Sequence, residues 1–110
     1  MTTSTPDVIQ AYQAAHDRRD TDAALAAFTS DAVVLDDGHE HHGTAAVRQW
    51  LSTAASDYTF TRTLLGAESR SDGRWLVRNH LSGDFPGGEV DLRYEFTLTD
   101  GLISRLVIAP

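Results

Sequence analysis

Residues 90–109 read VDLRYEFTLTDGLISRLVIA, and their pattern decides the class of fold. Apolar and polar side chains alternate through residues 90–99, and residues 102–109 form a second, mostly apolar run. Alternation is the period of strands with one buried face. Asp100-Gly101 separates the two runs, and this dipeptide is typical of tight hairpin turns. The stretch therefore predicts two long antiparallel strands.

The residues before this hairpin predict two further strands. Residues 58–68 and 74–82 show the same alternation, and residues 71–73 form a short glycine-containing link between them. Residues 83–88 are rich in glycine and predict a longer turn. Consecutive strands should therefore be antiparallel, and the second half of the chain should form one meandering sheet.

The first half of the chain has helical spacing instead. Apolar residues recur every three or four positions and predict helices over residues 6–19, 21–29 and 43–55. In the first of these, Pro6 is expected at the first helical position. The run of β-branched residues within 32–36 predicts a short strand. Three helices followed by a sheet give an α+β domain with the helices on one sheet face.

Length and composition exclude several classes of protein. The 110 residues include 16 acidic and 9 basic side chains, a formal net charge of -7, and no cysteine. This size gives a single domain over residues 1–110. The negative charge disfavours nucleic acid and membranes as partners, and the lack of cysteine excludes disulfides and thiolate chemistry. The sequence shows no signal peptide and no apolar run of about 20 residues, which predicts a cytoplasmic protein.

Residues 26–38, AAFTSDAVVLDDG, and residues 42–50, HGTAAVRQW, carry a family likeness. They resemble SnoaL-like proteins and ketosteroid isomerases of the nuclear transport factor 2-like (NTF2-like) superfamily, and the likeness covers nearly the whole chain. It implies a cone in which three N-terminal helices pack on a curved, mainly antiparallel sheet around a pocket. The superfamily includes isomerases, cyclases, dehydratases, epoxide hydrolases and binding modules, so the fold alone does not select an activity.

The resemblance to ketosteroid isomerases implies three catalytic residues. It puts the general base at Asp36, the phenol of the oxyanion hole at Tyr12 and a second acid at Asp91. In that chemistry the base removes a proton next to a carbonyl, while the donors stabilise the enolate oxygen. These three positions are the candidate catalytic site.

Each of the three residues has a structural alternative. Asp36 can instead serve the turn over residues 36–38, and Tyr12 can be a core aromatic. Asp91 alternates with Leu92 and Tyr94, so it faces outward if the apolar set faces the helices. Only a bulge at the start of that strand would turn Asp91 towards the pocket.

Four side chains are candidates for ligand contacts: His16, Trp50, His80 and Tyr94. His16 lies one helical turn after Tyr12 on the same face, so both can line one pocket. His80 lies on a strand and can line the pocket from the sheet. Trp50 can close the mouth of a cavity, although Trp50 and Tyr94 are also explained as core or interface aromatics.

Residues 39–42, His-Glu-His-His, suggest a metal site, because imidazole is a common ligand of transition metals. A structural zinc site needs four well-separated ligands, and no second pair has a suitable spacing. Phosphate-binding loops, dinucleotide fingerprints and nucleophile elbows are also missing from the sequence. We therefore expect a polar surface loop here, with no metal and no cofactor.

The sequence leads to two functional hypotheses. The first is a SnoaL-like small-molecule enzyme or binder with an apolar pocket for a cyclic or polyketide-like carbonyl compound. If catalytic, it would transfer a proton without a cofactor, as an isomerase or polyketide cyclase does. The alternative is a noncatalytic dimeric ligand-binding or accessory module of the same fold. The resemblance also implies a homodimer, paired through a sheet face that carries Trp75, Val77 and Leu81 or their alternates.

Overall fold

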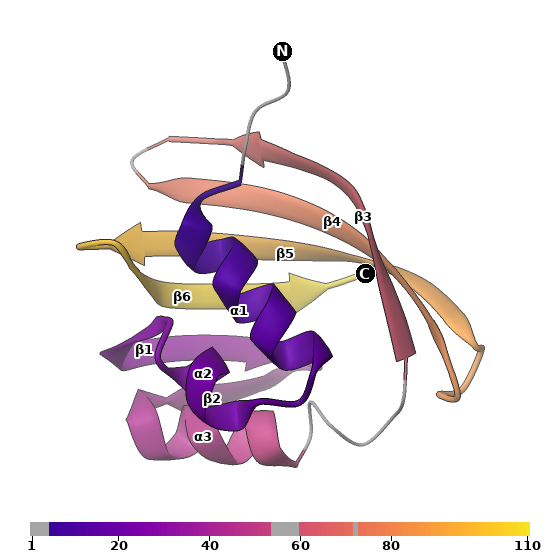
Figure 1. Ribbon diagram of the computed structural model, residues 1–110, viewed down its shortest axis with the longest axis horizontal. Helices are drawn as coiled ribbons and strands as arrows, with labels where there is room; N and C mark the ends of the chain where they lie inside the picture. Colours follow the sequence, from indigo (N-terminus) through magenta and orange to yellow (C-terminus); the bar gives the residue numbers. More distant parts are fainter. Residues whose placement is uncertain (1–4, 54–59, 72) are drawn as a thin grey trace.

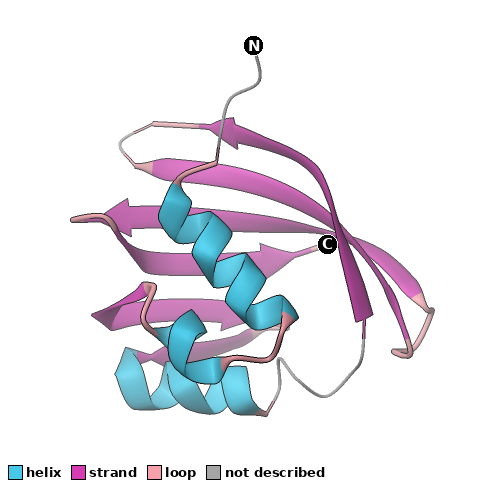
Figure 2. Ribbon diagram, viewed as in Figure 1, coloured by secondary structure: helices cyan, strands magenta, loops and turns pink. Residues whose placement is uncertain are grey.

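The computed structural model describes residues 5–53, 60–71 and 73–110, and in them three helices cover one face of a six-stranded sheet (Figures 1 and 2). The helices are α1 (Asp7–Asp17), α2 (Thr21–Leu25) and α3 (Gly43–Ser52). The strands are β1 (Phe28–Asp36), β2 (His39–His42), β3 (Phe60–Ser69), β4 (Arg74–Gly83), β5 (Glu89–Thr99) and β6 (Leu102–Ala109). This confirms the predicted α+β class. In the described part of the chain, every helix is too short or too polar to cross a membrane.

The sheet has the strand order β2-β1-β6-β5-β4-β3. Strands β3 to β6 form the predicted antiparallel meander, and β1 pairs with β6 in parallel. The bounds of β4, β5 and β6 match the prediction to within one residue at each end. Residues 58 and 59, where β3 was expected to begin, lie outside the described residues.

Two Asp-Gly dipeptides with left-handed backbone form tight hairpin turns. Asp100 and Gly101, with φ values of 52° and 80°, join β5 to β6. Asp37 and Gly38 have φ values of 53° and 75°, and they join β1 to β2 with Asp36 and His39 as register partners. Positive φ at both central positions is the geometry of a type I′ turn, which the Asp-Gly sequence favours. Asp36 is therefore the last residue of β1, paired with His39 directly beside the turn.

The structure corrects the prediction of a polar loop over residues 39–42. These residues form β2, the edge strand that pairs with β1. The sequence is polar because an edge strand with few buried positions needs no apolar alternation. Strand β1 also begins at Phe28, four residues before the predicted start, so the second helix is shorter than expected.

The observed ends of the helices agree in part with those predicted from the sequence. The carboxylate of Asp20 accepts a hydrogen bond from the backbone N–H of Ala23 at 3.1 Å, which caps α2. Pro6 occupies the cap position of α1, with a ψ of 145°, so the prediction that it begins the helix is wrong by one residue. Helix α3 ends at Ser52, and the predicted end near residue 55 lies outside the described residues.

The core lies between the helices and the face of the sheet that they cover, here called the inner face (Figure 1). Phe96, Leu106 and Val34 lie side by side on β5, β6 and β1, and each is at most 1% exposed. Ile9 of α1 and Trp50 of α3 belong to the same cluster. Because side chains alternate along a strand, every second residue points instead to the opposite, outer face.

This alternation decides which residues a second subunit could meet. Trp75, Val77 and Leu81 of β4 are in register with inner-face positions of β5. Their alternates on β4, Arg78 and His80 among them, point to the outer face. The expected dimer surface therefore consists of the alternates.

Candidate active site

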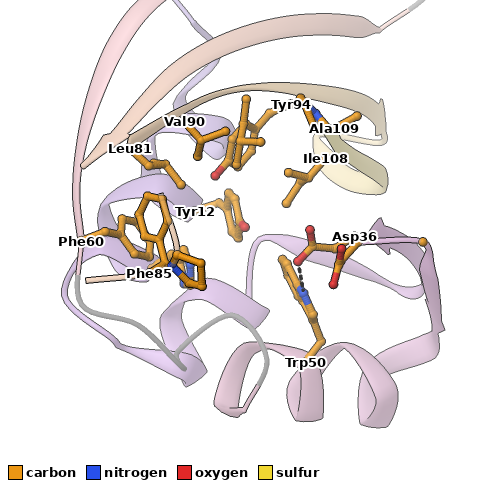
Figure 3. A pocket seen from close by; sticks show the side chains of 16 residues that line it. Tyr12, Asp36, Trp50, Phe60, Leu81, Phe85, Val90, Tyr94, Ile108 and Ala109 are labelled. Atoms are coloured by element: carbon orange, nitrogen blue, oxygen red, sulfur yellow. Dashed lines mark hydrogen bonds between the residues drawn. The ribbon is translucent and has the colours of Figure 1, made fainter. Parts of the chain in front are cut away.

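A pocket of about 580 Å³ opens between the inner face of the sheet and helices α1 and α3 (Figure 3). Most of its wall is aromatic or aliphatic, from Tyr12, Trp50, Phe60, Leu81, Phe85, Val90, Leu92, Tyr94 and Ile108. Its polar groups include His16, Asp36 and Asp37. Among the described residues that line it, none is Lys or Arg. The pocket therefore suits a mainly apolar ligand with few polar groups.

Asp36 faces this pocket from the end of β1. It shares the inner face with Val34, and its register partner on β6 is Ile108, which also lines the pocket. The indole N–H of Trp50 donates a hydrogen bond of 3.0 Å to Oδ2 of Asp36 (Figure 3). This bond fixes the carboxylate and leaves Oδ1 available to a ligand.

Tyr12 reaches the pocket from α1, where its ring packs edge-on against Phe28 and Phe96 at centroid distances of 5.3 and 5.9 Å. Its buried hydroxyl group has no hydrogen-bond partner among the described residues. Burial raises the pKa of Tyr12 well above its usual value, and neighbouring Tyr94 and Asp36 act in the same direction. The phenol is therefore protonated at neutral pH, and the described residues leave its hydrogen-bond donor unused.

Tyr94 brings a second phenol to the pocket from the sheet. It lies on the inner face of β5, in register with Val77 and Ile108. Burial raises the pKa of Tyr94, and the charge of Asp36 adds to this effect. Tyr94 therefore also stays protonated at neutral pH and can donate to a ligand.

His16 lines the pocket one turn beyond Tyr12. Its ring stacks on Tyr12 at a centroid distance of 6.0 Å and on Trp50 at 6.4 Å. Burial lowers the pKa of His16 to about 4, and the nearby charge of Arg19 contributes to this shift. The imidazole is therefore neutral at pH 7, with one donor and one acceptor nitrogen.

Two of the predicted site residues lie elsewhere, on the outer face. Asp91 and His80 are register partners, and Nδ1 of His80 is 2.5 Å from Oδ1 of Asp91. Nε2 of the same ring is 3.2 Å from Glu89, and the hydrogen bonds to Asp91 and Glu89 raise the pKa of His80. Neither residue lines the pocket. The reason is the alternation of β5, which turns Leu92 and Tyr94 inward and Asp91 outward.

Sequence reasoning missed two aromatic residues of the pocket wall. Phe60 begins β3, and Phe85 lies in the turn between β4 and β5. The dipeptide Phe85-Pro86 inside a glycine-rich turn is the signal that could have found this wall, because an apolar pair in a turn needs a surface to cover.

The histidines of β2 take part in other contacts. His42 forms an ion pair with Glu40, and the ring of His41 lies 6.2 Å from that of Trp50. In the part of the chain that the structure describes, no group of three or more His, Asp or Glu side chains could hold a metal ion.

The arrangement can perform acid–base chemistry on an oxygenated ligand. The carboxylate of Asp36 and the hydroxyl groups of Tyr12 and Tyr94 face one apolar cavity (Figure 3). A carboxylate supplies a proton acceptor, and two neutral phenols supply hydrogen-bond donors for a developing oxyanion.

Comparisons with known proteins agree with this fold. The sequence pattern of the SnoaL-like domain matches residues 9–106. A proposed polyketide cyclase of Sinorhizobium meliloti is 39% identical in sequence and has a solved structure with a TM-score of 0.89. That similarity covers 96% of this chain and 95% of the other. No curated protein matches the sequence.

Two more distant structures share the fold. A protein of Catenulispora acidiphila with a ketosteroid isomerase-like fold, in complex with trimethylamine, is 17% identical with a TM-score of 0.84, over 97% of this chain and 87% of that one. A Mycobacterium tuberculosis protein in complex with estradiol-17β-hemisuccinate is 21% identical with a TM-score of 0.78, over 94% and 90%. These likenesses confirm the predicted NTF2-like cone.

Proposed function

Because the chain belongs to the SnoaL-like domain family, we propose that its pocket catalyses cofactor-free proton transfer on a cyclic or polyketide-like carbonyl compound. The observation that carries the proposal is that Asp36 and Tyr12, whose buried hydroxyl has no partner among the described residues, line the same cavity of about 580 Å³. A cavity of this size holds a ligand of several fused or linked rings.

In the proposed reaction, Asp36 takes a proton from the carbon next to the carbonyl group. The electron pair of the broken C–H bond forms a C=C bond, and the carbonyl oxygen becomes an enolate. Tyr12 and Tyr94 donate hydrogen bonds to that oxygen. The protonated Asp36 then returns the proton to the far carbon of a conjugated dienolate, so that the carbonyl group re-forms and the substrate is isomerised. Alternatively, the enolate carbon attacks a second carbonyl group, whose oxygen takes the proton from Asp36 as the ring closes and the first carbonyl group re-forms.

The hydrogen bond from Trp50 supports the role of Asp36. It holds one carboxylate oxygen at 3.0 Å and so orients the other towards the cavity. A base that is fixed before the substrate arrives loses less entropy in the reaction. Trp50 is then a positioning residue, and His16 offers a neutral polar contact to the far part of the substrate.

Proton exchange tests the proposal directly. A panel of cyclic ketones, enones and aryl polyketide fragments is incubated with the protein in deuterated water, and deuterium at the carbon next to the carbonyl is followed by NMR. We expect exchange that depends on Asp36 for at least one ring compound. Binding of these compounds without any exchange above the rate in buffer would contradict the proposal.

The alternative is a noncatalytic ligand-binding or accessory module. The same Trp50–Asp36 bond favours it, since a carboxylate that accepts an indole N–H can be purely structural. The two functions differ in the effect of Asp36→Asn. A binding module keeps its ligand affinity and shows no turnover to lose.

We also propose that the protein is a homodimer that pairs through its outer face. An acidic row with Glu68 and Glu95 there runs beside a basic row with Arg78 and Arg93. Glu95 and Arg93 form no ion pair among the residues that the structure describes. A two-fold axis between the rows would place the acidic row of one subunit on the basic row of the other.

Charge reversal tests this dimer. Light scattering of the wild type should give twice the chain mass. Glu95→Arg and Arg93→Glu should each give monomers, whereas a mixture of the two variants should restore dimers. Arg48→Glu on α3 is the matched control and should leave the mass unchanged. A monomeric wild type at micromolar concentration would contradict the proposal.

A further inference from the structure

Arg62 lies next to the pocket although it does not line it. It stands on the inner face of β3, in register with Leu81, which is part of the pocket wall. Its side chain is only 16% exposed. A guanidinium group that is this buried needs hydrogen-bond and charge partners, because its desolvation is costly.

Its charge partner is Asp17, the last residue of α1. Nε of Arg62 lies 3.0 Å from Oδ1 of Asp17, and Nη2 lies 2.8 Å from Oδ2. Two parallel bonds of this kind fix both the distance and the orientation of the two groups. The pair joins the end of the helix that carries Tyr12 and His16 to β3, which is one of the two edge strands of the sheet.

The remaining nitrogen of Arg62 forms hydrogen bonds with a second residue of α1 and with a residue of β4. Nη1 donates to Oε1 of Gln13 at 3.4 Å and to Oδ1 of Asn79 at 3.1 Å. Gln13 follows Tyr12 directly, and Asn79 on β4 is fully buried. Because a guanidinium only donates, it also fixes which way both side-chain amides point. Arg62 therefore joins α1, β3 and β4 at one point beside the pocket.

The positive charge of Arg62 reaches the titratable groups of the pocket. It lowers the pKa of Tyr12 and of Tyr94, against the larger effect of burial. It also lowers the pKa of His16 and so helps to keep that ring neutral. Asp17 acts in the opposite direction on all three residues. Arg62 thus makes negative charge near the two phenols less unfavourable.

We propose that Arg62 is a positioning residue that holds Tyr12 and His16 in place, and that its charge stabilises negative charge on a ligand oxygen next to Tyr12 and Tyr94. The second half of this inference rests on the proposed function, which places an oxyanion there. The first half depends only on the contacts of Arg62 with Asp17, Gln13 and Asn79.

An oxyanion probe separates the two effects. Para-nitrophenol is titrated into an Asp36→Asn background, which removes the opposing carboxylate, and its visible absorbance distinguishes bound phenolate from bound phenol. Adding Arg62→Gln should weaken phenolate binding by about tenfold and change binding of the neutral phenol little, as expected for one charge acting across partly buried protein. Arg48→Gln removes an arginine that pairs with Asp22 on the helical side, and it should change neither.

Asp17→Asn gives the opposite sign. It removes the charge that opposes Arg62 while keeping one acceptor oxygen, so phenolate binding should become stronger. If Arg62→Gln and Asp17→Asn both weaken phenol and phenolate equally, the charge effect is overturned. If Arg62→Gln does not fold, the sign of the Asp17→Asn effect still decides the question.

NMR titration of His16 provides a readout that needs no ligand. The pKa of His16, lowered to about 4 in the wild type, should rise in Arg62→Gln and fall further in Asp17→Asn. An unchanged His16 titration in both folded variants would overturn the inference. If the wild type exchanges no substrate protons but these titrations shift as expected, the proposed function fails and the inference about Arg62 stands.

Discussion

Two neighbouring rows of side chains on the inner face of the sheet differ in their surroundings, because one packs into the core and the other borders the pocket. The closed row consists of Trp75, Phe96, Leu106 and Val34. The open row lies two residues along each strand and consists of Val77, Tyr94, Ile108 and Asp36. The closed row contributes three of its four members to the fully packed core, whereas Tyr94, Ile108 and Asp36 line the pocket.

The difference shows how little distance separates a core from a site. Two residues along a strand span about 7 Å. Within that step the side chains change from all-apolar to a mixture in which Tyr94 and Asp36 have apolar surroundings and polar tips. The same packing that stabilises the closed row also holds the bodies of the polar residues in the open row, so the polar tips are placed by the core itself.

Among the substitutions that test the difference between the two rows, Asp36→Asn should have the largest effect, which is on the rate of proton exchange. Loss of the base removes the proton acceptor, so exchange should fall by about 10²–10⁴-fold while the melting temperature changes little. The control is Asp37→Asn, at a neighbouring carboxylate that also lines the pocket but begins the turn. Full exchange activity in Asp36→Asn would remove Asp36 from the reaction.

Truncation of one side chain in each row should show that the closed row contributes more to the free energy of unfolding than the open row does. Phe96→Ala should lower the free energy of unfolding by about 3–5 kcal/mol, because it opens a cavity in packed core. Ile108→Ala should cost only about 2 kcal/mol, the low end for such a change, because its side chain already borders a cavity. Urea unfolding measures both. Equal losses would show that the open row is packed as tightly as the closed one.

The pH dependence of stability should report His16. Its pKa is about 4 in the folded protein and 6.5 in the unfolded chain. The unfolded chain therefore binds the proton first, so the contribution of His16 is complete above pH 6.5 and is lost as the pH falls towards 4. The loss should reach roughly 3 kcal/mol, at 1.36 kcal/mol per pKa unit. His16→Phe should unfold with a weaker dependence on pH over this range, and an identical dependence would contradict the prediction.

Tyr12→Phe should slow the reaction less than Asp36→Asn does. It removes one of two donors, and the loss of a well-aimed donor costs about 100-fold in rate, or roughly 2.7 kcal/mol. Stability should be unchanged or slightly higher, since the hydroxyl has no partner among the described residues. Tyr94→Phe is the matched variant from the sheet. Equal rates for Tyr12→Phe and the wild type would exclude Tyr12 as a donor to the reacting oxygen.

Most of the fold could be predicted because the local patterns agree with the packing. Alternation in residues 74–109 reflects one buried sheet face, so β4, β5 and β6 match their predicted bounds closely. The polar strand β2 could not be predicted in this way. It is defined by its hydrogen bonds to β1, and its side chains carry no alternation of apolar residues.

The sequence predicted the candidate site only where the position of a residue in a strand determined the direction of its side chain. Strand parity correctly indicated that Leu92 and Tyr94 face inward and that Asp91 faces outward. The assignment of Asp91 to the site relied on the family resemblance against this parity. Contacts such as that of Arg62 with Asp17 join residues 45 positions apart, and no local pattern in the sequence encodes such a pair.

The hydrogen bond between Trp50 and Asp36 also has an optical consequence. The chain contains two tryptophans, Trp50 in the pocket and Trp75 in the closed row. A molecule that reaches Asp36 changes the surroundings of the Trp50 indole and leaves those of Trp75 as they were. In Trp75→Phe, the tryptophan fluorescence of the protein therefore comes from Trp50 alone, whose indole is hydrogen-bonded to the carboxylate, and occupancy of the pocket can be followed without any label.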